Sequence, residues 1–525
     1  MSELTGLQFV AGEAVAGTGE PFTAIDPVAG SALSPTFREA GSDQIDRACR
    51  AAGAAAPVLQ ACSRPQRAQL LRAIADGLTG LGDRLLERVT AETALPRPRV
   101  QNELARTQLQ LRQFADLIVE GEYLDVRIDH ADTKRPGPPK PDLRSMRVPL
   151  GPVAVFGASN FPLAYSVAGG DTASALAAGC PVVVKAHPAH PGTSELVADV
   201  VVAAVRQQGL PAGVFAMLHG RTPATGGALV QHPAITAVGF TGSLQAGRSL
   251  CALAAARPAP IPVFAEMGSM NPVLVLPKAL AARGAAIAEQ LVASATLAQG
   301  QFCTSPGLVA YLDGPGADAF VGALRDRFAA ANGGPAVHPS IRASFEKALA
   351  EVSALPVTTA ACAANASGAA TALRPVLLHT SAAVVLQQAR LREEIYGPAV
   401  LAVACRDRAE LLALVESLHG HLTGTVHGDG DDVVLHGDIC STLARRVGRL
   451  IGNGVPTGVE VCPSMVHGGP WPAASDARFT AVGSGAIARW LRPLCWQDWP
   501  ADALPLELQE QNPLRVRRRV DGRLE

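Results

Sequence analysis

The sequence predicts an α/β protein with two parallel-sheet domains and a small additional arm. Between Val148 and Leu276, short β-branched runs such as GPVAVFG, PVVVK and AITAVGF alternate with alanine-rich helical stretches. This alternation is typical of a parallel sheet that helices cover on both faces. Residues 277–470 repeat it with more irregular loops. A chain of 525 residues is also too long for one core, so two or three domains are expected.

The first predicted domain combines residues 148–276 with residues 1–121. Apolar residues recur at three- and four-residue spacing in RAQLLRAIADGLTGL and ELARTQLQLRQFADLIVEG, so residues 42–121 are expected to form amphipathic covering helices. The alternation of strands and helices is that of a dinucleotide-binding domain. Residues 277–470 form the second predicted domain.

Two segments are predicted to lie outside these domains. Residues 122–147 mix charge, proline and the alternating run YLDVRI, which suits a protruding arm. Residues 484–525 form a C-terminal tail that contains Trp490, Trp496 and Trp499. Because exposed tryptophans tend to be buried against a partner, arm and tail together predict a homo-oligomer, with a homodimer favoured over a tetramer.

Composition excludes several classes of partner. Lysine and arginine total 45 against 46 aspartate and glutamate, a formal net charge of −1, which gives no overall attraction to nucleic acid or to an anionic membrane. A small molecule is therefore the expected partner. The N-terminus lacks a basic segment before a long apolar run, and no stretch of about 20 apolar residues occurs, which predicts a cytoplasmic protein. The ten cysteines include no CxxC pair and no cluster at zinc-ligand spacing, so neither disulfides nor a metal site are predicted.

Polar residues follow several predicted strands of the first domain. Asn160 comes directly after GPVAVFG, and Lys185 ends PVVVK. Ligands bind at the carboxyl ends of strands in open α/β sheets, so the Asn160 amide could donate to a substrate oxygen and Lys185 could bind a ribose or a phosphate. Two structural alternatives remain open from these residues alone. Asn160 could cap the next helix, and Lys185 could extend its amine to solvent.

Three further motifs carry possible chemistry. Phe240, Thr241, Gly242 and Ser243 end the strand AITAVGF and open a helix, whose free N–H groups suit a pyrophosphate, although a GxGxxG fingerprint is missing. Glu266 ends the strand IPVFAE, and Cys303 follows Gly300-Gln301-Phe302. A carboxylate that takes a proton and a thiol that attacks a carbonyl are what covalent aldehyde oxidation needs.

Taken together, these segments resemble the aldehyde dehydrogenase superfamily over most of the chain. The family's motifs occur in order as SNFP, the strand-ending Lys185, FTGS, EMGS, GQFC and EEIYGP. The resemblance implies that Cys303 is the nucleophile, that Glu266 is the general base, and that Asn160 helps to form the oxyanion hole. It also implies that residues 277–470 are the catalytic domain. Cofactor contacts are implied for Lys185, Gly242, Ser243, Phe240 and Glu394.

Departures from the family pattern narrow the expectation. Where NAD-preferring relatives carry a glutamate just after the strand-ending lysine, this chain reads KAHPAHPGTSE, so NADP is expected to be preferred over NAD, with Arg221 as a candidate partner of the 2′-phosphate. Three segments, this run, VCPSMVHGGPWPAASDARFTAVGS and RPLCWQDWP, resemble the branch of α-ketoglutaric semialdehyde (2,5-dioxovalerate) dehydrogenases and NADP-dependent fatty aldehyde dehydrogenases. In that branch a histidine matching His467 lies near the cysteine, where it could tune the thiol or serve only a structural turn.

Alternatives of other classes remain. A cofactor-free cysteine hydrolase or acyltransferase could use Cys303 with His467, but it would leave Lys185 and Glu394 without a role. A silent structural relative is disfavoured because Asn160 and Glu266 accompany Cys303. Within the family, 2,5-dioxovalerate is the favoured substrate and a fatty aldehyde the alternative.

Overall fold

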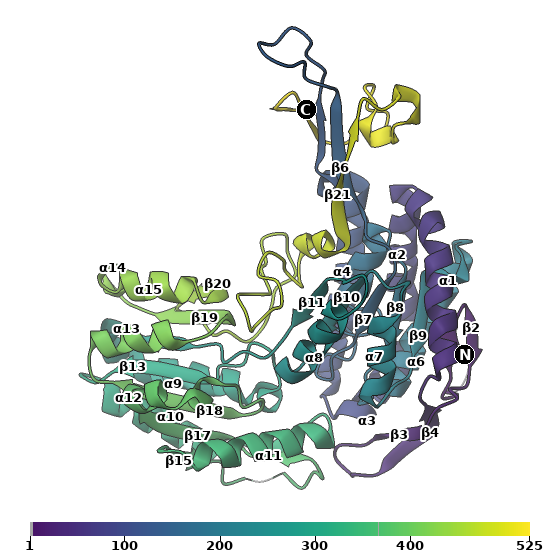
Figure 1. The fold of residues 1–525 in the computed structure, drawn as a ribbon. Coiled ribbons are helices and arrows are strands. Elements are labelled where there is room, and N and C mark those ends of the chain that lie inside the picture. The colour runs from purple at the N-terminus through teal and green to yellow at the C-terminus, as the bar shows by residue number, and fades with distance from the viewer. Residues whose placement is uncertain (1–3, 366) are drawn as a thin grey trace.

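The computed structural model of the chain describes residues 4–365 and 367–525. It contains two seven-stranded sheets, each packed between helices, and a five-stranded sheet that projects away from them (Figure 1). Two short pairs form separate two-stranded sheets: β3 (Pro21–Ile25) with β4 (Ala32–Arg38), and β14 (Gly334–Pro335) with β16 (Ala372–Leu373). The predicted fold class, two parallel-sheet α/β units with an arm, is confirmed.

The first sheet has the strand order β11-β10-β7-β8-β9-β1-β2. Its bounds are β7 (Val153–Phe156), β8 (Val182–Lys185), β9 (Phe215–Leu218), β10 (Ala237–Thr241), β11 (Val263–Glu266), β1 (Gln8–Val10) and β2 (Glu13–Val15). Strands β7 to β11 are parallel, whereas β1 and β2 add an antiparallel edge. The chain moves outward from β7 through β8 and β9, then returns to β10 on the other side of β7. This reversal is a topological switch point, where α/β sheets bind ligands.

Helices α1 to α8 lie around this sheet, the first four within the predicted amphipathic region of residues 42–121. They are α1 (Ser42–Ala61), α2 (Arg64–Gly80), α3 (Gly82–Thr93), α4 (Arg97–Glu120), α5 (Gly170–Ala178), α6 (Pro191–Gln207), α7 (Pro223–Gln231) and α8 (Leu244–Ala255). In α2 the Ser63 hydroxyl accepts the N–H of Gln66 while the Gln66 side chain returns to Ser63, a capping box that fixes the start of the helix. The apolar stripe of α2 is fully buried, which confirms the predicted helices of residues 42–121.

The second sheet has the order β15-β17-β18-β13-β12-β19-β20. All its pairs are parallel except β15 with β17. Its strands are β12 (Val273–Val275), β13 (Leu308–Leu312), β15 (Thr358–Cys362), β17 (Val376–Ser381), β18 (Ala399–Cys405), β19 (His421–His427) and β20 (Val447–Gly452). The helices are α9 (Pro277–Thr296), α10 (Ala317–Ala330), α11 (Pro339–Ser353), α12 (Ala382–Gln387), α13 (Arg408–Ser417), α14 (Asp432–Leu435) and α15 (Gly437–Ala444).

One predicted boundary is corrected by this topology. The segment NPVLVL was assigned to the first domain, residues 148–276, but β12 pairs with β13 and β19 in the second sheet. An apolar run shows that a strand is buried but not which sheet it joins. The first sheet therefore ends at β11, and the connection between the two sheets falls within residues 267–272.

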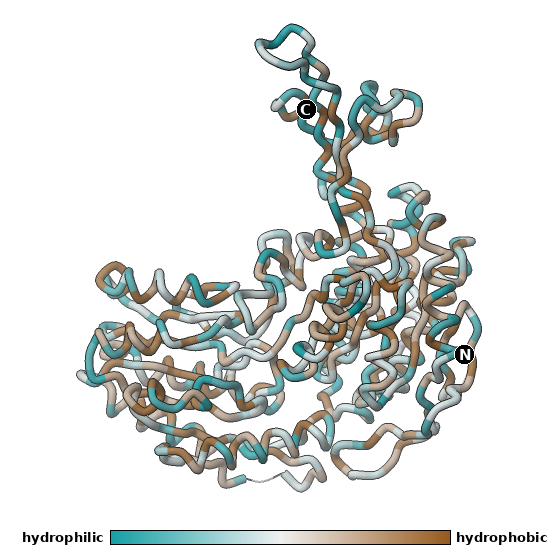
Figure 2. The backbone as a smooth tube through the Cα atoms, viewed as in Figure 1, coloured by the Kyte–Doolittle hydropathy of each residue, from teal (hydrophilic) through white to brown (hydrophobic). Residues whose placement is uncertain are grey.

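The arm is built from both segments that the sequence assigned to it. The sheet order is β21-β6-β5-β22-β23, from β5 (Val126–Asp129), β6 (Leu143–Pro149), β21 (Leu491–Gln497), β22 (Arg518–Val520) and β23 (Arg523–Leu524). It stands away from both larger sheets in Figure 1. Every residue of β6 is only half-buried, and Figure 2 shows hydrophobic stretches along the arm below a more hydrophilic tip.

Trp490 of the tail is buried within the chain itself. Trp490 is fully buried in the chain's own core, where its indole N–H donates to the Ser174 hydroxyl at 2.7 Å and its ring meets Phe264 edge-on. Trp499 is 52% exposed and Trp496 is half-buried. The expectation that Trp490 is buried against a partner is therefore wrong, because the segment before β21 folds back onto α5.

The helices of residues 4–365 and 367–525 include none that is both long and apolar enough to cross a membrane. All ten cysteines are free thiols.

Candidate active site

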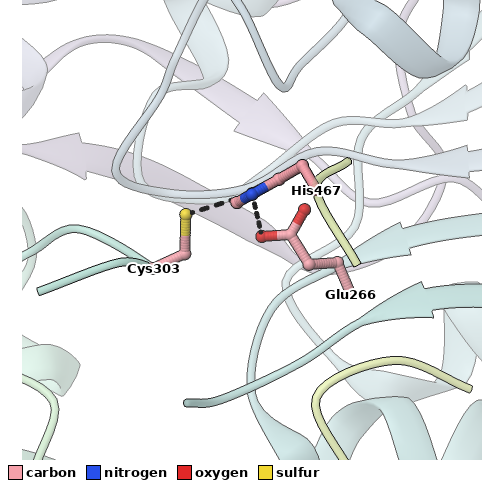
Figure 3. Close-up of side chains that lie close together, drawn as sticks. All are labelled: Glu266, Cys303 and His467. Carbon is pink, nitrogen blue, oxygen red and sulfur yellow. Dashed lines mark hydrogen bonds and ion pairs between the residues drawn. The ribbon is translucent and has the colours of Figure 1, made fainter. Parts of the chain in front are cut away.

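Three chemically active side chains meet between the two large sheets. Glu266 is the last residue of β11, Cys303 lies in a loop after a short 3-10 helix (Leu297–Gly300), and His467 lies in the irregular segment after β20. The Cys303 Sγ is 3.4 Å from the His467 Nε2, and that same nitrogen is 2.9 Å from the Glu266 Oε1 (Figure 3). Glu266 and His467 are buried, whereas Cys303 is partly exposed. The sequence-predicted nucleophile and base are thus bridged by His467.

Backbone hydrogen bonds explain why His467 lies here. The segment that follows it runs beside β11: the Met267 N–H donates to the Ala473 carbonyl at 2.8 Å, and the Ser475 N–H donates to the Ala265 carbonyl at 2.9 Å. The His467 N–H donates to the Thr480 hydroxyl at 2.9 Å. These bonds hold the His467 imidazole against the Glu266 carboxylate, so the residue contacts the catalytic groups directly.

The surroundings keep the thiol protonated at rest. Burial raises the pKa of Cys303 well above its usual value, and the charge and hydrogen bonding of Glu266 raise it further, while the Arg106 guanidinium opposes both. A thiol whose pKa is raised in this way needs a base beside it before it can attack. The His467 Nε2 is the nearest ring nitrogen and leads on to Glu266, which gives the proton a path away from sulfur.

Asn160 contacts the loop that carries the nucleophile. Its Nδ2 donates to the Gln301 carbonyl at 2.9 Å, and an amide nitrogen has a second N–H to offer. The alternative that Asn160 caps the next helix is wrong, because α5 begins at Gly170 with Gly169 at its N-cap. The arrangement leaves one amide donor beside Cys303 for an oxyanion.

Asn271, which the sequence did not single out, holds the loop that carries Cys303. Asn271 is fully buried, and its Nδ2 donates to the carbonyls of Cys303 and Ser305, both at 2.9 Å. Its Oδ1 accepts from the hydroxyls of Ser269 and Thr423, also both at 2.9 Å. Ser269, where the family usually has glycine, therefore takes part in this network. The sequence feature that could have pointed to Asn271 is its position five residues after the predicted base Glu266.

The predicted cofactor residues lie at the carboxyl ends of adjacent parallel strands. Lys185 ends β8, Phe240 lies near the end of β10, and Ser243 is the N-cap of α8, with its hydroxyl accepting from Ala246 at 3.3 Å. The Gly242 N–H donates to the Glu266 carbonyl at 3.0 Å, which ties this edge to the catalytic residues. Lys185 is half-buried, and burial lowers its pKa to about 8.

Lys185 has an acidic neighbour that the sequence analysis also missed. The negative charge of Glu39 partly offsets the effect of burial on Lys185. The Glu39 carboxylate accepts from the N–H groups of Arg221 and Thr222 at 2.8 and 2.7 Å, and these bonds keep its pKa below the usual value although burial works against them. Arg221 itself is exposed, and its backbone rather than its side chain makes this contact. Glu39 lies too far from Lys185 in sequence for any motif to have joined them.

Glu394 lies beside Gly268, which is two residues after Glu266. Burial raises its pKa to about 8, and its charge also raises the pKa of Cys303. A Cβ added at Gly268 would lie 2.4 Å from the Glu394 Oε2, so the carboxylate in this position packs directly against the glycine. The structure thereby brings Glu394 and the EMGS motif together.

A cavity of about 220 Å³ opens beside Cys303. Its lining includes two arginines, Arg99 and Arg106, which lie seven residues apart on α4 and so face the same way. The aromatic rings of Phe161, Tyr165 and Phe302 form much of the remaining wall. The sequence analysis found no arginine for a substrate carboxylate, although the helical spacing of this pair was a usable signal.

Comparison with known proteins identifies the family. The sequence profile of the aldehyde dehydrogenase family matches residues 14–436. The chain belongs to the aldehyde dehydrogenase family. It is 48% identical over 524 residues to alpha-ketoglutaric semialdehyde dehydrogenase 2 of Azospirillum brasilense, with 100% of both chains covered. It is 43% identical over 527 residues to alpha-ketoglutaric semialdehyde dehydrogenase of Acinetobacter baylyi, with 99% of each chain covered.

Solved aldehyde dehydrogenases share the fold. A betaine aldehyde dehydrogenase from Staphylococcus aureus, solved with NAD⁺, superposes with a TM-score of 0.80 at 20% identity over 95% of this chain and 98% of its own. Aldehyde dehydrogenase C from Pseudomonas syringae, solved with NAD⁺ and octanal, gives a TM-score of 0.78 at 21% identity over 94% and 97%. Family membership is evidence against the alternative of a cofactor-free cysteine hydrolase.

Proposed function

We propose that this aldehyde dehydrogenase oxidises 2,5-dioxovalerate, α-ketoglutaric semialdehyde, to 2-oxoglutarate. The observation that carries the proposal is the arginine pair Arg99 and Arg106 in the cavity beside Cys303. The names of the two full-length relatives, from Azospirillum brasilense and Acinetobacter baylyi, support the same substrate. A cavity of about 220 Å³ is smaller than the 300 to 1,000 Å³ typical of drug-sized ligands, which favours a short substrate.

The charges in the cavity favour a substrate that carries a carboxylate. Arg99 is already paired with Glu103 at 2.7 Å and lies 4.5 Å from the Phe161 ring centre. Arg106 donates to the Tyr165 hydroxyl at 3.2 Å, and its buried Nε has no partner within the described residues. The cavity wall therefore carries the guanidinium groups of Arg99 and Arg106 but only one carboxylate, that of Glu103. A substrate carboxylate would pair with Arg106, whereas a fatty aldehyde would leave that donor unpaired at a cost of about 1–3 kcal/mol.

The catalytic residues fit covalent oxidation through a thioester. His467 takes the proton of the Cys303 thiol and shares it with Glu266, and the sulfur then attacks the aldehyde carbon to form a thiohemiacetal. The free N–H of the Asn160 amide stabilises the oxyanion of that adduct. After oxidation of the adduct to a thioester, Glu266 takes a proton from the water that attacks the acyl carbon. The acid leaves, and the thiol is restored.

The residues at the edge of the first sheet fit a nicotinamide dinucleotide, which makes this sheet the cofactor domain and the second sheet the catalytic domain. The chemistry that such a cofactor supplies when bound is hydride acceptance. The α8 N-terminus, with Gly242 and Ser243, suits the pyrophosphate, and Lys185 suits the adenosine ribose. The Glu394 carboxylate, which lies beside Gly268, suits the hydroxyls of the nicotinamide ribose.

For the choice of cofactor we propose NADP over NAD, with Glu39 as the residue that limits the preference. Lys185 can meet a 2′-phosphate, and the loop that follows it contains no acidic residue before Glu195. Glu195 is bound instead to the backbone of Thr5 and Gly6. Glu39 is the carboxylate whose charge reaches Lys185, and its own backbone bonds keep it ionised.

The ten free thiols support a cytoplasmic location.

The arm and tail support assembly as a homodimer. Strands β6 and β21 form a sheet with little core, and Trp499, two residues after β21, is half exposed. Light scattering at micromolar concentration would give twice the monomer mass if this is right. A monomer under those conditions would contradict it.

The proposed function is tested by comparing kcat/KM for 2,5-dioxovalerate and hexanal. Wild type should prefer 2,5-dioxovalerate by about 100-fold or more, because the site's buried donors are left unpaired by hexanal. Arg106→Met should remove most of that preference, whereas Arg112→Met, on the outer face of α4 and paired with Asp76, should keep it. Equal kcat/KM for both aldehydes in wild type would overturn the substrate and favour the fatty aldehyde alternative.

A further inference from the structure

Glu266, Cys303 and His467 offer one nitrogen, one sulfur and one oxygen that all lie within 4.8 Å of one another. The Sγ to Nε2 distance is 3.4 Å and the Nε2 to Oε1 distance is 2.9 Å. In a tetrahedral zinc site, bond lengths of about 2.0–2.3 Å put neighbouring ligand atoms roughly 3.5 Å apart. The Sγ to Nε2 spacing matches this value, the Nε2 to Oε1 spacing is about half an ångström shorter, and the third spacing is within 4.8 Å, so small side-chain movements would form a zinc tripod. They come from segments far apart in the sequence, so ligand spacing along the chain could not reveal them.

A second observation points to a ligand at this place. The Glu266 Oε2 is buried and has no hydrogen-bond partner in the part of the chain that the structure describes. The Nε2 of His467 contacts both the Cys303 thiol and the Glu266 carboxylate, and one proton on that nitrogen cannot make a good hydrogen bond to both. A cation bound to the sulfur, to Nε2 and to the Glu266 carboxylate would replace the proton that these groups share.

The surroundings select the kind of metal. The guanidinium groups of Arg106 and Arg449 are close enough to act on the Cys303 thiol electrostatically, and they disfavour a cation held by charge alone. Magnesium and calcium take oxygen ligands in sets of six or more, which this site lacks. Zinc forms strong bonds to thiolate and imidazole and accepts one carboxylate. Cys303 also lines the substrate cavity, which leaves a fourth position open to water or aldehyde.

We propose that Glu266, Cys303 and His467 form an inhibitory Zn²⁺ site that reversibly stops catalysis. On binding, the Cys303 S–H bond breaks, the proton is released to solvent and a sulfur–zinc bond forms, with no change of oxidation state. The metal then occupies the nucleophile, the base and the histidine between them. The site depends on the positions of these three side chains and not on which aldehyde the enzyme oxidises.

The direct test is a cobalt titration of the full-length protein after dialysis against a chelator. Co²⁺ bound through Cys303 gives a thiolate-to-cobalt charge-transfer band, and the expected result is one equivalent that Zn²⁺ displaces. Cys303→Ser should abolish the band, and His467→Asn and Glu266→Gln should each weaken binding at least about tenfold. Cys495→Ser, which removes an exposed thiol of the arm, is the matched control and should leave the band intact. A band that survives in Cys303→Ser, or no band at millimolar Co²⁺, overturns the proposal.

An activity measurement separates this site from ordinary reaction of a thiol with metal. Zn²⁺ should inhibit wild type, and a chelator should restore full activity. The His467→Asn and Glu266→Gln variants, compared through their remaining turnover, should need at least about tenfold more Zn²⁺ for half-inhibition. Equal sensitivity in wild type and both variants would mean that sulfur alone binds the metal and would overturn the tripod. Failure of metal-free enzyme to oxidise 2,5-dioxovalerate would instead refute the proposed function and leave the cobalt result standing.

Discussion

The cofactor edge and the nucleophile loop lie side by side but are held in different ways. At the cofactor edge, parallel strands set the positions: Thr241 of β10 is in register with Glu266 of β11, and the next N–H continues onto the Glu266 carbonyl. Around Cys303, side chains make the connections, through the amides of Asn160 and Asn271. Strand ends thus position binding groups by backbone pairing, whereas the reacting atoms depend on single side-chain bonds.

This difference predicts unequal effects of mutation. Changes near Cys303 remove a bond-forming step, whereas changes at the strand ends weaken binding of a ligand that other groups still hold. The expected effects therefore fall from the nucleophile loop to the cofactor edge.

The largest effect is expected for Cys303→Ala. Removing the nucleophile should lower kcat on the order of 10⁴-fold or more, because without the thiol no thioester can form. Cofactor affinity, measured by fluorescence titration, should stay unchanged because its residues lie at the strand ends. Cys495→Ala serves as the control and should keep full activity. Turnover within tenfold of wild type would show that another residue is the nucleophile.

Glu266→Gln should lower the steady-state rate by about 10²- to 10⁴-fold through slow hydrolysis of the thioester. The attack itself should survive, since the Glu266 charge raises the pKa of the Cys303 thiol and its loss favours the thiolate. Stopped-flow absorbance should therefore show a burst of reduced cofactor followed by a slow phase. A slow first turnover with no burst would place the role of Glu266 before oxidation.

At the cofactor edge, Glu39→Gln should shift the ratio of kcat/KM for NADP to that for NAD by about tenfold towards NADP, the equivalent of roughly 1.4 kcal/mol. The reason is the loss of the one carboxylate whose charge reaches Lys185. Glu13→Gln, which changes an exposed carboxylate of β2, should leave the ratio unaltered. An unchanged ratio in Glu39→Gln would show that Glu39 does not face the adenosine ribose.

The smallest effect is a pH dependence of cofactor use. The pKa of Lys185 is lowered to about 8, so its ammonium is charged below that pH and is lost as the pH rises through it. Between pH 7 and pH 9, kcat/KM for NADP should fall relative to that for NAD by roughly threefold, since the 2′-phosphate loses its cation. Lys185→Met should show a flat ratio over the same range. A ratio that falls equally in both proteins would assign the dependence to another group.

The two regions also differ in how far the sequence could predict them. Lys185, Ser243 and Glu266 could be found because strand ends of a parallel sheet share one edge, and the alternation of strands and helices is visible in the sequence. Cys303 could be noticed as a possible attacking thiol, but only the resemblance assigned it as the nucleophile and pointed to His467, since the loops that carry them have no periodicity.

Other features could not be predicted because they are three-dimensional. Glu39 and Asn271 act through hydrogen bonds to segments that only the fold brings near. Strand β12 joined the second sheet although its apolar run looks like its predecessors, and Trp490 turned inward because Ser174 offered its indole a partner. Composition shows that such residues will be buried but not against which neighbour.

The central claim, that oxidation proceeds through a thioester on Cys303, is tested most directly by trapping that thioester. Glu266→Gln protein mixed with NADP and 2,5-dioxovalerate should be quenched in acid, digested and analysed by mass spectrometry. The account predicts an acyl group on the peptide that contains Cys303, in an amount equal to the burst of reduced cofactor. Reduced cofactor without acylation of that peptide, or acylation of another cysteine, would contradict it.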